Sequence, residues 1–195
     1  MLGKRPAGLP EGVFVHPLAF VESAAIGNET RVWAFAHVMK GSTIGERCNL
    51  GEQVFIESGA VVGNGVTVKN GISIWDLVTI EDDVFLGPHM VFTNDPKPRA
   101  FIKLGHDSLV PTRIRKGATI GAGATLVCGV TIGQYAFVAA GAVVTRNVPD
   151  FGLVKGNPAK LSSYICRCTR TRFSLPAKSE AACSHCGTAN PQIQS

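Results

Sequence analysis

Residues 114–145 read IRKGATIGAGATLVCGVTIGQYAFVAAGAVVT, with a large aliphatic residue at every sixth position. A small or β-branched residue stands two positions earlier, and glycine often follows the large residue. An α-helix would carry a six-residue repeat around its surface, and plain strand alternation does not need one large residue in six. A short strand followed by a tight turn does explain the spacing. The pattern predicts a parallel β-helix with inward-facing Ile114, Ile120, Leu126, Ile132, Val138 and Val144.

The same repeat occupies most of the chain that precedes this stretch. If three hexads close one turn, the repeats make about seven coils, which stack through backbone hydrogen bonds and need caps at both ends. We expect an N-terminal cap over residues 1–13, a β-helix over 14–148, and a capping segment over 149–164 that is helix-like from Pro158 to Tyr164. The large residues upstream are Phe14, Phe20, Ile26, Val32, Val38, Ile44, Leu50, Ile56, Val62, Val68, Ile74, Ile80, Leu86 and Phe92.

Composition limits the classes of function. The 195 residues are 45% hydrophobic, which suffices for one well-buried domain with a small appendage. No apolar run suits a secretory signal or a membrane span, so we expect a cytoplasmic protein without membrane insertion. The net charge is +5, and basic residues concentrate between residues 93 and 116. No aromatic-interleaved basic motif predicts nucleic-acid binding, and a phosphate-bearing small molecule is the favoured partner.

The repeat is interrupted between residues 93 and 113. Pro96 and Pro98 cannot donate hydrogen bonds to neighbouring strands, so this segment is expected to leave the β-helix as a loop. Binding residues often lie on loops that a rigid scaffold holds in place. The alternative is a loop without a role, which its concentration of Asn, Asp, Arg and Lys disfavours.

The segments that flank the loop resemble a known family. Residues 81–94, which end in Phe92-Thr93-Asn94, and Pro98-Arg99-Ala100 are similar to N-acetyltransferases that act on nucleotide-linked amino sugars. The likeness spans residues 12–161 and is greatest to the 3-N-acetyltransferases for UDP-2-acetamido-3-amino-2,3-dideoxyglucuronate. It implies a left-handed all-β prism, a homotrimer, acetyl-CoA as donor and a role in bacterial surface-polysaccharide (O-antigen) synthesis. The sequence departs from the family at residues 95–97, which leaves a dTDP-linked 3-amino-3,6-dideoxyhexose as the alternative acceptor.

The resemblance places Asn94 at the reacting amino group. Its amide can accept a hydrogen bond from the amine and direct the nitrogen lone pair toward the thioester, although it cannot act as a base. His89 is our candidate base, since a neutral imidazole can take up the proton that acyl transfer releases. A structural histidine at a coil corner is the alternative for His89. Asp95 is an alternative base, or a residue that orients His89.

Further residues are expected to hold the two substrates. Arg99 and Lys103 are candidates for the nucleotide diphosphate, and Asp76 and Glu81 for sugar hydroxyls or the neighbouring subunit. In the family, coenzyme A lies in a groove between the C-terminal coils of two subunits, where small residues expose the backbone. Packing would also select such residues. The candidates for coenzyme A are Gly123, Ala139, Ala140 and Gly141 in the groove, with Lys155 and Lys160 at its phosphates.

A cysteine-rich tail follows over residues 165–195. Cys166 and Cys168 form a CxC pair, and Cys183 and Cys186 form a CxxC pair. Two thiol pairs resemble a zinc ribbon, in which Zn²⁺ takes four thiolates and orders a segment too small for its own core. His185 can replace one ligand in this interpretation. The alternative is a disordered basic tail without metal.

Two other classes of function use a β-helix. A γ-type carbonic anhydrase needs three histidines on a zinc ion between subunits, and the five histidines here show no pair at the close spacing that this requires. A non-catalytic scaffold would need neither the Phe-Thr-Asn loop nor the C-terminal coils of the coenzyme A type. The sequence therefore favours the acetyltransferase.

Overall fold

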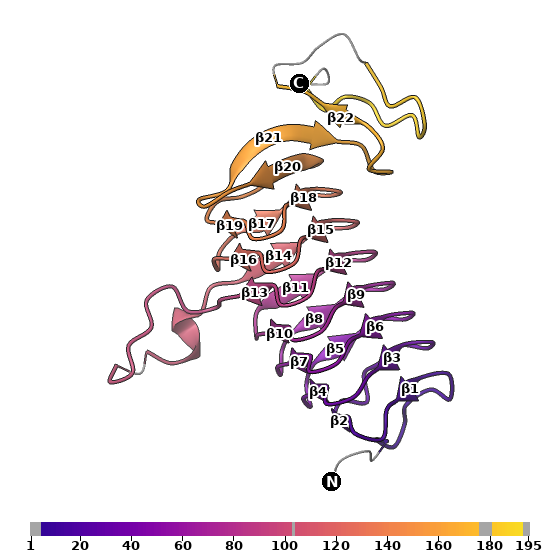
Figure 1. The fold of residues 1–195 in the computed structure, drawn as a ribbon. Helices are drawn as coiled ribbons and strands as arrows, with labels where there is room; N and C mark the ends of the chain where they lie inside the picture. Colours follow the sequence, from indigo (N-terminus) through magenta and orange to yellow (C-terminus); the bar gives the residue numbers. More distant parts are fainter. Residues whose placement is uncertain (1–4, 103, 176–180, 193–195) are drawn as a thin grey trace.

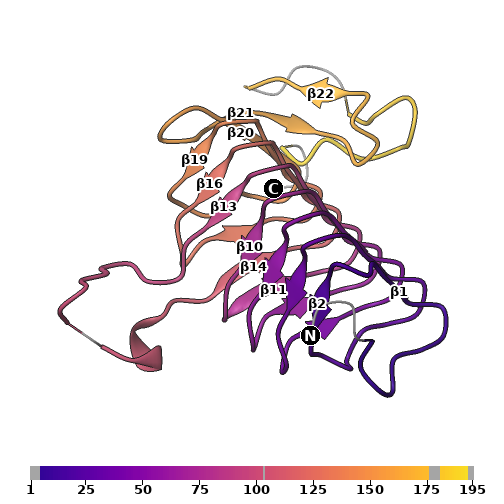
Figure 2. The same cartoon turned by 60° about the horizontal axis from the view of Figure 1, so that its bottom comes forward.

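A computed structural model describes residues 5–102, 104–175 and 181–192, and Lys103 lies outside them. The chain winds into a tapering stack of coils with a triangular cross-section (Figures 1 and 2). Each coil contributes one short strand to each side, and equivalent residues of successive regular coils are 18 positions apart, as in the pairing of Phe55 with Ser73. The coiled arrangement and the six-residue repeat are confirmed.

Three sides make up the prism. The first holds β1 (Phe14–Val15), β3 (Arg31–Val32), β6 (Asn49–Leu50), β9 (Thr67–Val68), β12 (Phe85–Leu86), β15 (Thr119–Ile120) and β18 (Phe137–Val138). The second holds β2 (Phe20–Val21), β4 (His37–Val38), β7 (Phe55–Ile56), β10 (Ser73–Ile74), β13 (Val91–Phe92), β16 (Thr125–Leu126) and β19 (Val143–Val144). The third holds β5 (Thr43–Ile44), β8 (Val61–Val62), β11 (Val78–Ile80), β14 (Thr112–Ile114) and β17 (Thr131–Ile132).

The core is a column of aliphatic side chains along the prism axis. From Ile26 onward, every predicted large residue of the repeat is buried. The prediction was wrong for Phe14 and Phe20, because Val15 and Val21 take the inward positions beside them. Ile26 follows Val21 by five positions instead of six, so the register shifts by one position, and Phe14 is left 43% exposed.

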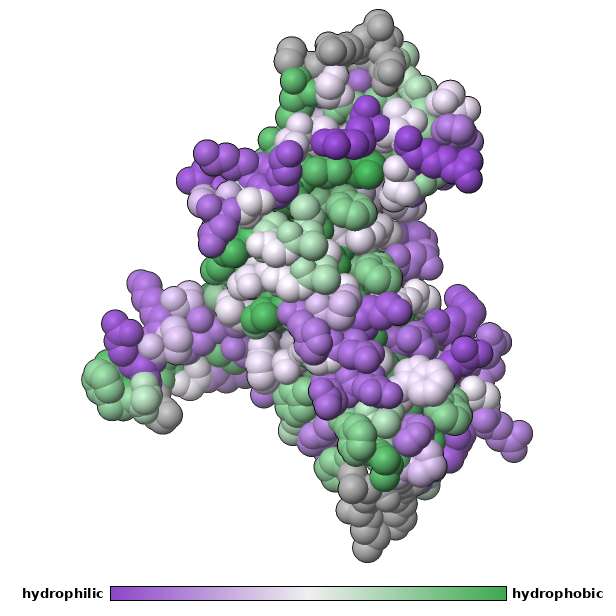
Figure 3. Space-filling model, in the orientation of Figure 1, coloured by the Kyte–Doolittle hydropathy of each residue, from purple (hydrophilic) through white to green (hydrophobic). Residues whose placement is uncertain are grey.

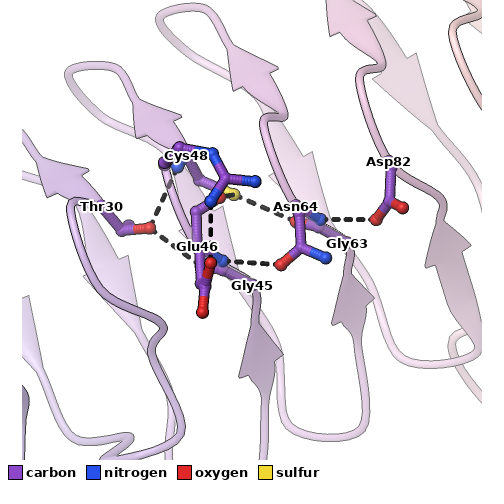
Figure 4. A network of polar contacts seen from close by, with 8 residues as sticks. Thr30, Gly45, Glu46, Cys48, Gly63, Asn64 and Asp82 are labelled. Carbon is purple, nitrogen blue, oxygen red and sulfur yellow. Dashed lines mark hydrogen bonds and ion pairs between the residues drawn. The ribbon is translucent and has the colours of Figure 1, made fainter.

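Polar side chains join successive coils at the corners, as Figure 4 shows for one of them. The Asn64 side-chain oxygen accepts from the Glu46 amide at 2.9 Å, and Asp82 accepts from the Asn64 amide at 2.8 Å. The Cys48 thiol, which is buried, donates to the Gly63 carbonyl at 3.0 Å. These bonds satisfy backbone groups that the turns leave without ladder partners.

The C-terminal cap is a sheet extension. β20 (Gly152–Lys155) pairs in parallel with β18, and the chain then reverses into β21 (Lys160–Ile165) and β22 (Arg172–Phe173), both antiparallel. The expected helix-like stretch from Pro158 to Tyr164 was wrong, because most of it pairs with β20 as a strand. The described residues form a single 3₁₀ turn, η1 (His106–Ser108), and no helix able to span a membrane.

Candidate active site

The loop leaves the prism after β13 (Figure 1), and Asn94 is the second residue beyond the end of that strand. Asp76 occupies the equivalent position on the coil below, 18 residues before Asn94. The strands that precede the two residues, β10 and β13, are in contact. Strands of adjacent coils are about 4.8 Å apart. Asp76 and Asn94 therefore occupy neighbouring levels of one corner.

The loop folds back onto this corner. Its neck is closed by the Val110 amide, which donates to the Asn94 carbonyl at 2.9 Å. Within the loop, η1 directs His106 downward, and its Nε2 lies 2.6 Å from Oδ2 of Asp76. His106 is 62% exposed in its side chain and Asp76 only 20%. The fold thus brings an imidazole and a carboxylate together beside solvent, one coil below Asn94.

Asp76 is held firmly for this contact. Its Oδ1 accepts from the Leu77 amide at 2.7 Å, and its own amide donates to Glu57 at 2.8 Å. Gly59 on the coil below leaves room for the carboxylate, because a Cβ there would collide with Oδ1. Gly59 also has φ +86, which L side chains rarely adopt. With Oδ1 occupied, Oδ2 remains for His106.

His89 lies at a different corner from Asn94. It has φ 56, its exposed ring covers Gly71 of the coil below, and β13 separates it from Asn94. Five extended residues span roughly 16 Å. Within one chain, the structure brings His106 to Asp76, one coil below Asn94, and keeps His89 a strand away.

The candidate substrate ligands fall into two groups. Asp95 accepts a bond from the Lys97 amide at 2.8 Å, and with Arg99 it lines a depression of about 390 Å³ in the loop. Glu81 lies at the third corner, where its carboxylate binds the Arg113 side chain at 2.7 Å and the Lys116 amide at 3.0 Å. The structure therefore places Asp76, Asp95 and Arg99 in or beside the loop, and Glu81 apart from it.

The candidate coenzyme A residues gather along one edge of the upper coils. Gly123 and Gly141 stack at the corner above His89, and a Cβ on either glycine would meet no atom within 4 Å. Ala140 beside them is also exposed, and Ala139 is half-buried. Lys155 and Lys160 face each other across the β20–β21 hairpin.

This hairpin is fastened to the same edge. The Val143 amide donates to Gly156 at 3.0 Å, and the Ala159 amide donates to Val143 at 2.8 Å. Open backbone and two exposed lysines thus lie at the end of β16 and β19 opposite the Asn94 corner. Such an edge can hold an extended, phosphate-bearing molecule.

A second cluster lies in the tail, where the four thiols of Cys166, Cys168, Cys183 and Cys186 converge. Hydrogen bonds from Thr188 lower the pKa of Cys186 to about 5, and a bond from Thr171 lowers the pKa of Cys183. His185 is exposed and lies outside the cluster.

Sequence reasoning missed His106. It lies 30 residues from Asp76, inside the segment that interrupts the repeat. The only available signal was a histidine in a loop already expected to bind substrate.

Comparisons with known proteins agree with the fold and the reaction class. The model of the bacterial transferase hexapeptide (six repeats) family matches residues 23–58 and 111–146, and that of the hexapeptide repeat of succinyl-transferase matches 42–75. The dTDP-3-amino-3,6-dideoxy-α-D-galactopyranose 3-N-acetyltransferase of Aneurinibacillus thermoaerophilus is 53% identical over 159 residues, 82% of each chain.

More distant relatives share part of their length with this chain. A bifunctional protein GlmU from Thermosynechococcus vestitus is 31% identical over 70% of this chain, which spans 28% of that protein. The acetyltransferase domain of PglB from Neisseria gonorrhoeae, solved with acetyl coenzyme A, superposes with a TM-score of 0.53 at 25% identity. That match covers 77% of this chain and 57% of the other. With its left-handed β-helix, the chain belongs to the hexapeptide-repeat acetyltransferases.

Proposed function

We propose that this protein transfers the acetyl group of acetyl-CoA to the 3-amino group of a nucleotide-linked sugar. The favoured acceptor is a dTDP-linked 3-amino-3,6-dideoxyhexose. The relative that is 53% identical over 82% of the chain carries such a substrate in its name. This favours the alternative acceptor of the sequence analysis over the UDP-linked glucuronate derivative.

The observation that carries the proposal is the contact between His106 and Asp76, one coil below Asn94, where the loop leaves the prism. Nε2 of His106 faces the Asp76 carboxylate at 2.6 Å, which suits an N–H donor at Nε2. The neutral ring then keeps its lone pair on Nδ1. An aspartate that orients a histidine in this way is a recurrent arrangement for a general base.

Each residue has a defined part in the reaction. The Asn94 amide oxygen accepts a hydrogen bond from the sugar amine, whose lone pair attacks the thioester carbonyl carbon. A C–N bond forms, and Nδ1 of His106 takes the proton that the nitrogen gives up. The C–S bond then breaks, and the leaving thiolate is protonated from the imidazolium. Alignment and proton transfer together account for the catalysis expected of such a site.

We assign the remaining contacts by charge and position. Arg99, on the loop, would bind the nucleotide diphosphate, as would Lys103. Asp76 and Asp95 would also border the sugar. The edge formed by Gly123, Ala139, Ala140, Gly141, Lys155 and Lys160 would hold acetyl-CoA, with the lysines at its phosphates. His89 and Glu81 are kept as the alternative base and as a contact to a neighbouring subunit.

We also propose a homotrimer, with sites between subunits. The loop tip carries Phe101 and Leu104, which are 82% and 60% exposed, and Figure 3 shows this apolar tip projecting from the prism. A side of the prism further presents a column of rings in tilted or edge-on contact, formed by Phe20, His37, Phe55 and Trp75. Apolar surface of this kind marks interaction sites. Acetyl-CoA would then contact two subunits.

The test is acetyl-CoA turnover with a matched panel of nucleotide sugars. We expect the highest kcat/KM with dTDP-3-amino-3,6-dideoxygalactose, less with its glucose epimer, and least with UDP-2-acetamido-3-amino-2,3-dideoxyglucuronate. No turnover of any 3-amino sugar would refute the proposed function, and preference for the UDP sugar would restore the other acceptor. Light scattering that finds an active monomer would contradict the trimer. A cytoplasmic location and a role in surface-polysaccharide synthesis stay predictions.

A further inference from the structure

Four thiols converge at the C-terminal end of the chain. The sulfur atoms of Cys166, Cys168, Cys183 and Cys186 all lie within 4.8 Å of one another. Cys166 and Cys168 are 3.3 Å apart, and Cys168 and Cys183 are 3.8 Å apart. With Zn–S bonds of about 2.3 Å, the sulfurs of a tetrahedral zinc site are about 3.8 Å apart. The spacing suits four ligands of one ion, and all four cysteines are free of disulfides.

The two thiol pairs lie on loops of the same construction. The Cys166 amide donates to the Thr171 carbonyl at 3.0 Å, and the Cys183 amide donates to the Thr188 carbonyl at 2.8 Å. In both loops the first cysteine is thus bonded to a threonine five residues later. Two matching turns present their thiols to a common centre.

The same threonines support the sulfur atoms. The Thr171 amide donates to the Cys166 sulfur at 3.2 Å, and its hydroxyl lies 3.1 Å from the Cys183 sulfur. The Thr188 hydroxyl lies 3.1 Å from the Cys186 sulfur. Outer hydrogen bonds of this kind orient metal ligands and stabilise thiolates.

Among its described residues, the apolar core of the tail is small. Its apolar cluster buries Phe173 together with two of the cysteines, Cys166 and Cys183. A segment with so small a core needs a crosslink or a metal ion to fold. Four thiolates around Zn²⁺ leave a net charge of −2, and the exposed Arg167 and Arg170 lie on the first ligand loop, where they offset it.

We propose that Cys166, Cys168, Cys183 and Cys186 bind one Zn²⁺ ion, as a structural centre that fastens the tail onto the last coils. The first ligand follows β21 directly, so the ion ties the second loop to the sheet that caps the prism. That loop, with Cys186 and Gly187, borders a cavity against the stacked rings of Tyr135 and Phe151. The ion takes no part in acetyl transfer, and His185 is not a ligand.

The test is the zinc content of the full-length chain, produced with zinc in the medium and purified under reducing conditions without chelators. We expect one zinc per chain in the wild type, in Cys128→Ser and in His185→Asn. Cys128 is the matched control, because it lies in a coil outside the cluster. Cys183→Ser and Cys186→Ser should carry almost none.

A second measurement covers variants that lose the tail fold. Trypsin should cut at Arg167 or Arg170 rapidly in Cys186→Ser and slowly in the zinc-loaded wild type. A wild type without zinc would overturn the proposal, as would zinc retained in both cysteine variants. Iron in place of zinc would overturn the choice of metal. Because metal content is read without substrate, this result is separate from the outcome of the acetyl-transfer assay.

Discussion

Replacing His106 by Asn tests whether this loop histidine is the general base of the reaction. The amide keeps a hydrogen bond to Asp76 but cannot take a proton at neutral pH. General bases contribute about 10²–10⁴ in rate. The side chain is 62% exposed, where water weakens electrostatic effects, so we expect the lower end of that range. A loss of about 10² in kcat corresponds to about 2.7 kcal/mol of transition-state stabilisation.

Asp76→Asn should have a smaller effect. The variant keeps the acceptor for Leu77 but loses the charged partner of His106, now 2.6 Å away. Such bonds contribute about 1.5–3 kcal/mol in general, and exposure reduces this to about 1 kcal/mol here, or roughly a fivefold loss in kcat. KM for acetyl-CoA should not change in either variant, because its proposed edge lies at the opposite end of β16 and β19.

The assay is initial-rate acetyl transfer to a dTDP-linked 3-amino sugar, measured as thiol release across pH. A general base imposes a falling rate on the acidic side of the profile, and His106→Asn should abolish that limb. His16→Asn is the control, since His16 follows β1 in the first coil, where its Nδ1 accepts from the Leu18 amide at 3.1 Å. A wild-type rate and profile in His106→Asn would refute the reasoning. If His89→Asn loses the limb instead, the base lies at the other corner.

Three further outcomes can be measured. Asn94→Ala should lower kcat roughly tenfold to a thousandfold, which is the scale of one lost transition-state hydrogen bond. The affinity for acetyl-CoA should be retained, and a wild-type rate would exclude Asn94 from the site. Ile120→Ala, fully buried in a middle coil, should lower the free energy of unfolding by about 3 kcal/mol in urea titrations. Phe14→Ala, at a 43% exposed position, should cost under about 1 kcal/mol, and equal losses would contradict the corrected register. Burial raises the pKa of the Cys48 thiol, so alkylation at pH 8 should be slow when folded and fast in denaturant; rapid labelling of the folded protein would contradict its burial.

The repeat made the prism predictable, because each six-residue unit contains the pattern for one strand and one turn. From Ile26 to Val144, the predicted large residues at that spacing are buried. The same six-residue spacing gave a wrong prediction in the first coil. A spacing of five between Val21 and Ile26 turns the phenylalanines outward, and apolar residues on both sides of the strand hid the shift.

Near Pro158 the local signal favoured a helix, but pairing with β20 made the segment a strand. The segment finds this pairing partner only once the chain has folded, so the sequence of the segment alone does not reveal it. Backbone hydrogen bonds to an existing sheet edge outweigh the weak preferences of a short sequence.

The candidate site divides along the same line. The sequence by itself determined that residues 93–113 leave the coils as a loop, and that four cysteines occur in two pairs. Only the tertiary structure decided that His106 meets Asp76 across 30 residues, that His89 lies a strand away, and that the four thiols form one cluster. A repeat determines neighbours because stacking places equivalent residues one coil apart. An irregular loop has no such rule, and its contacts follow from how the whole chain closes around it.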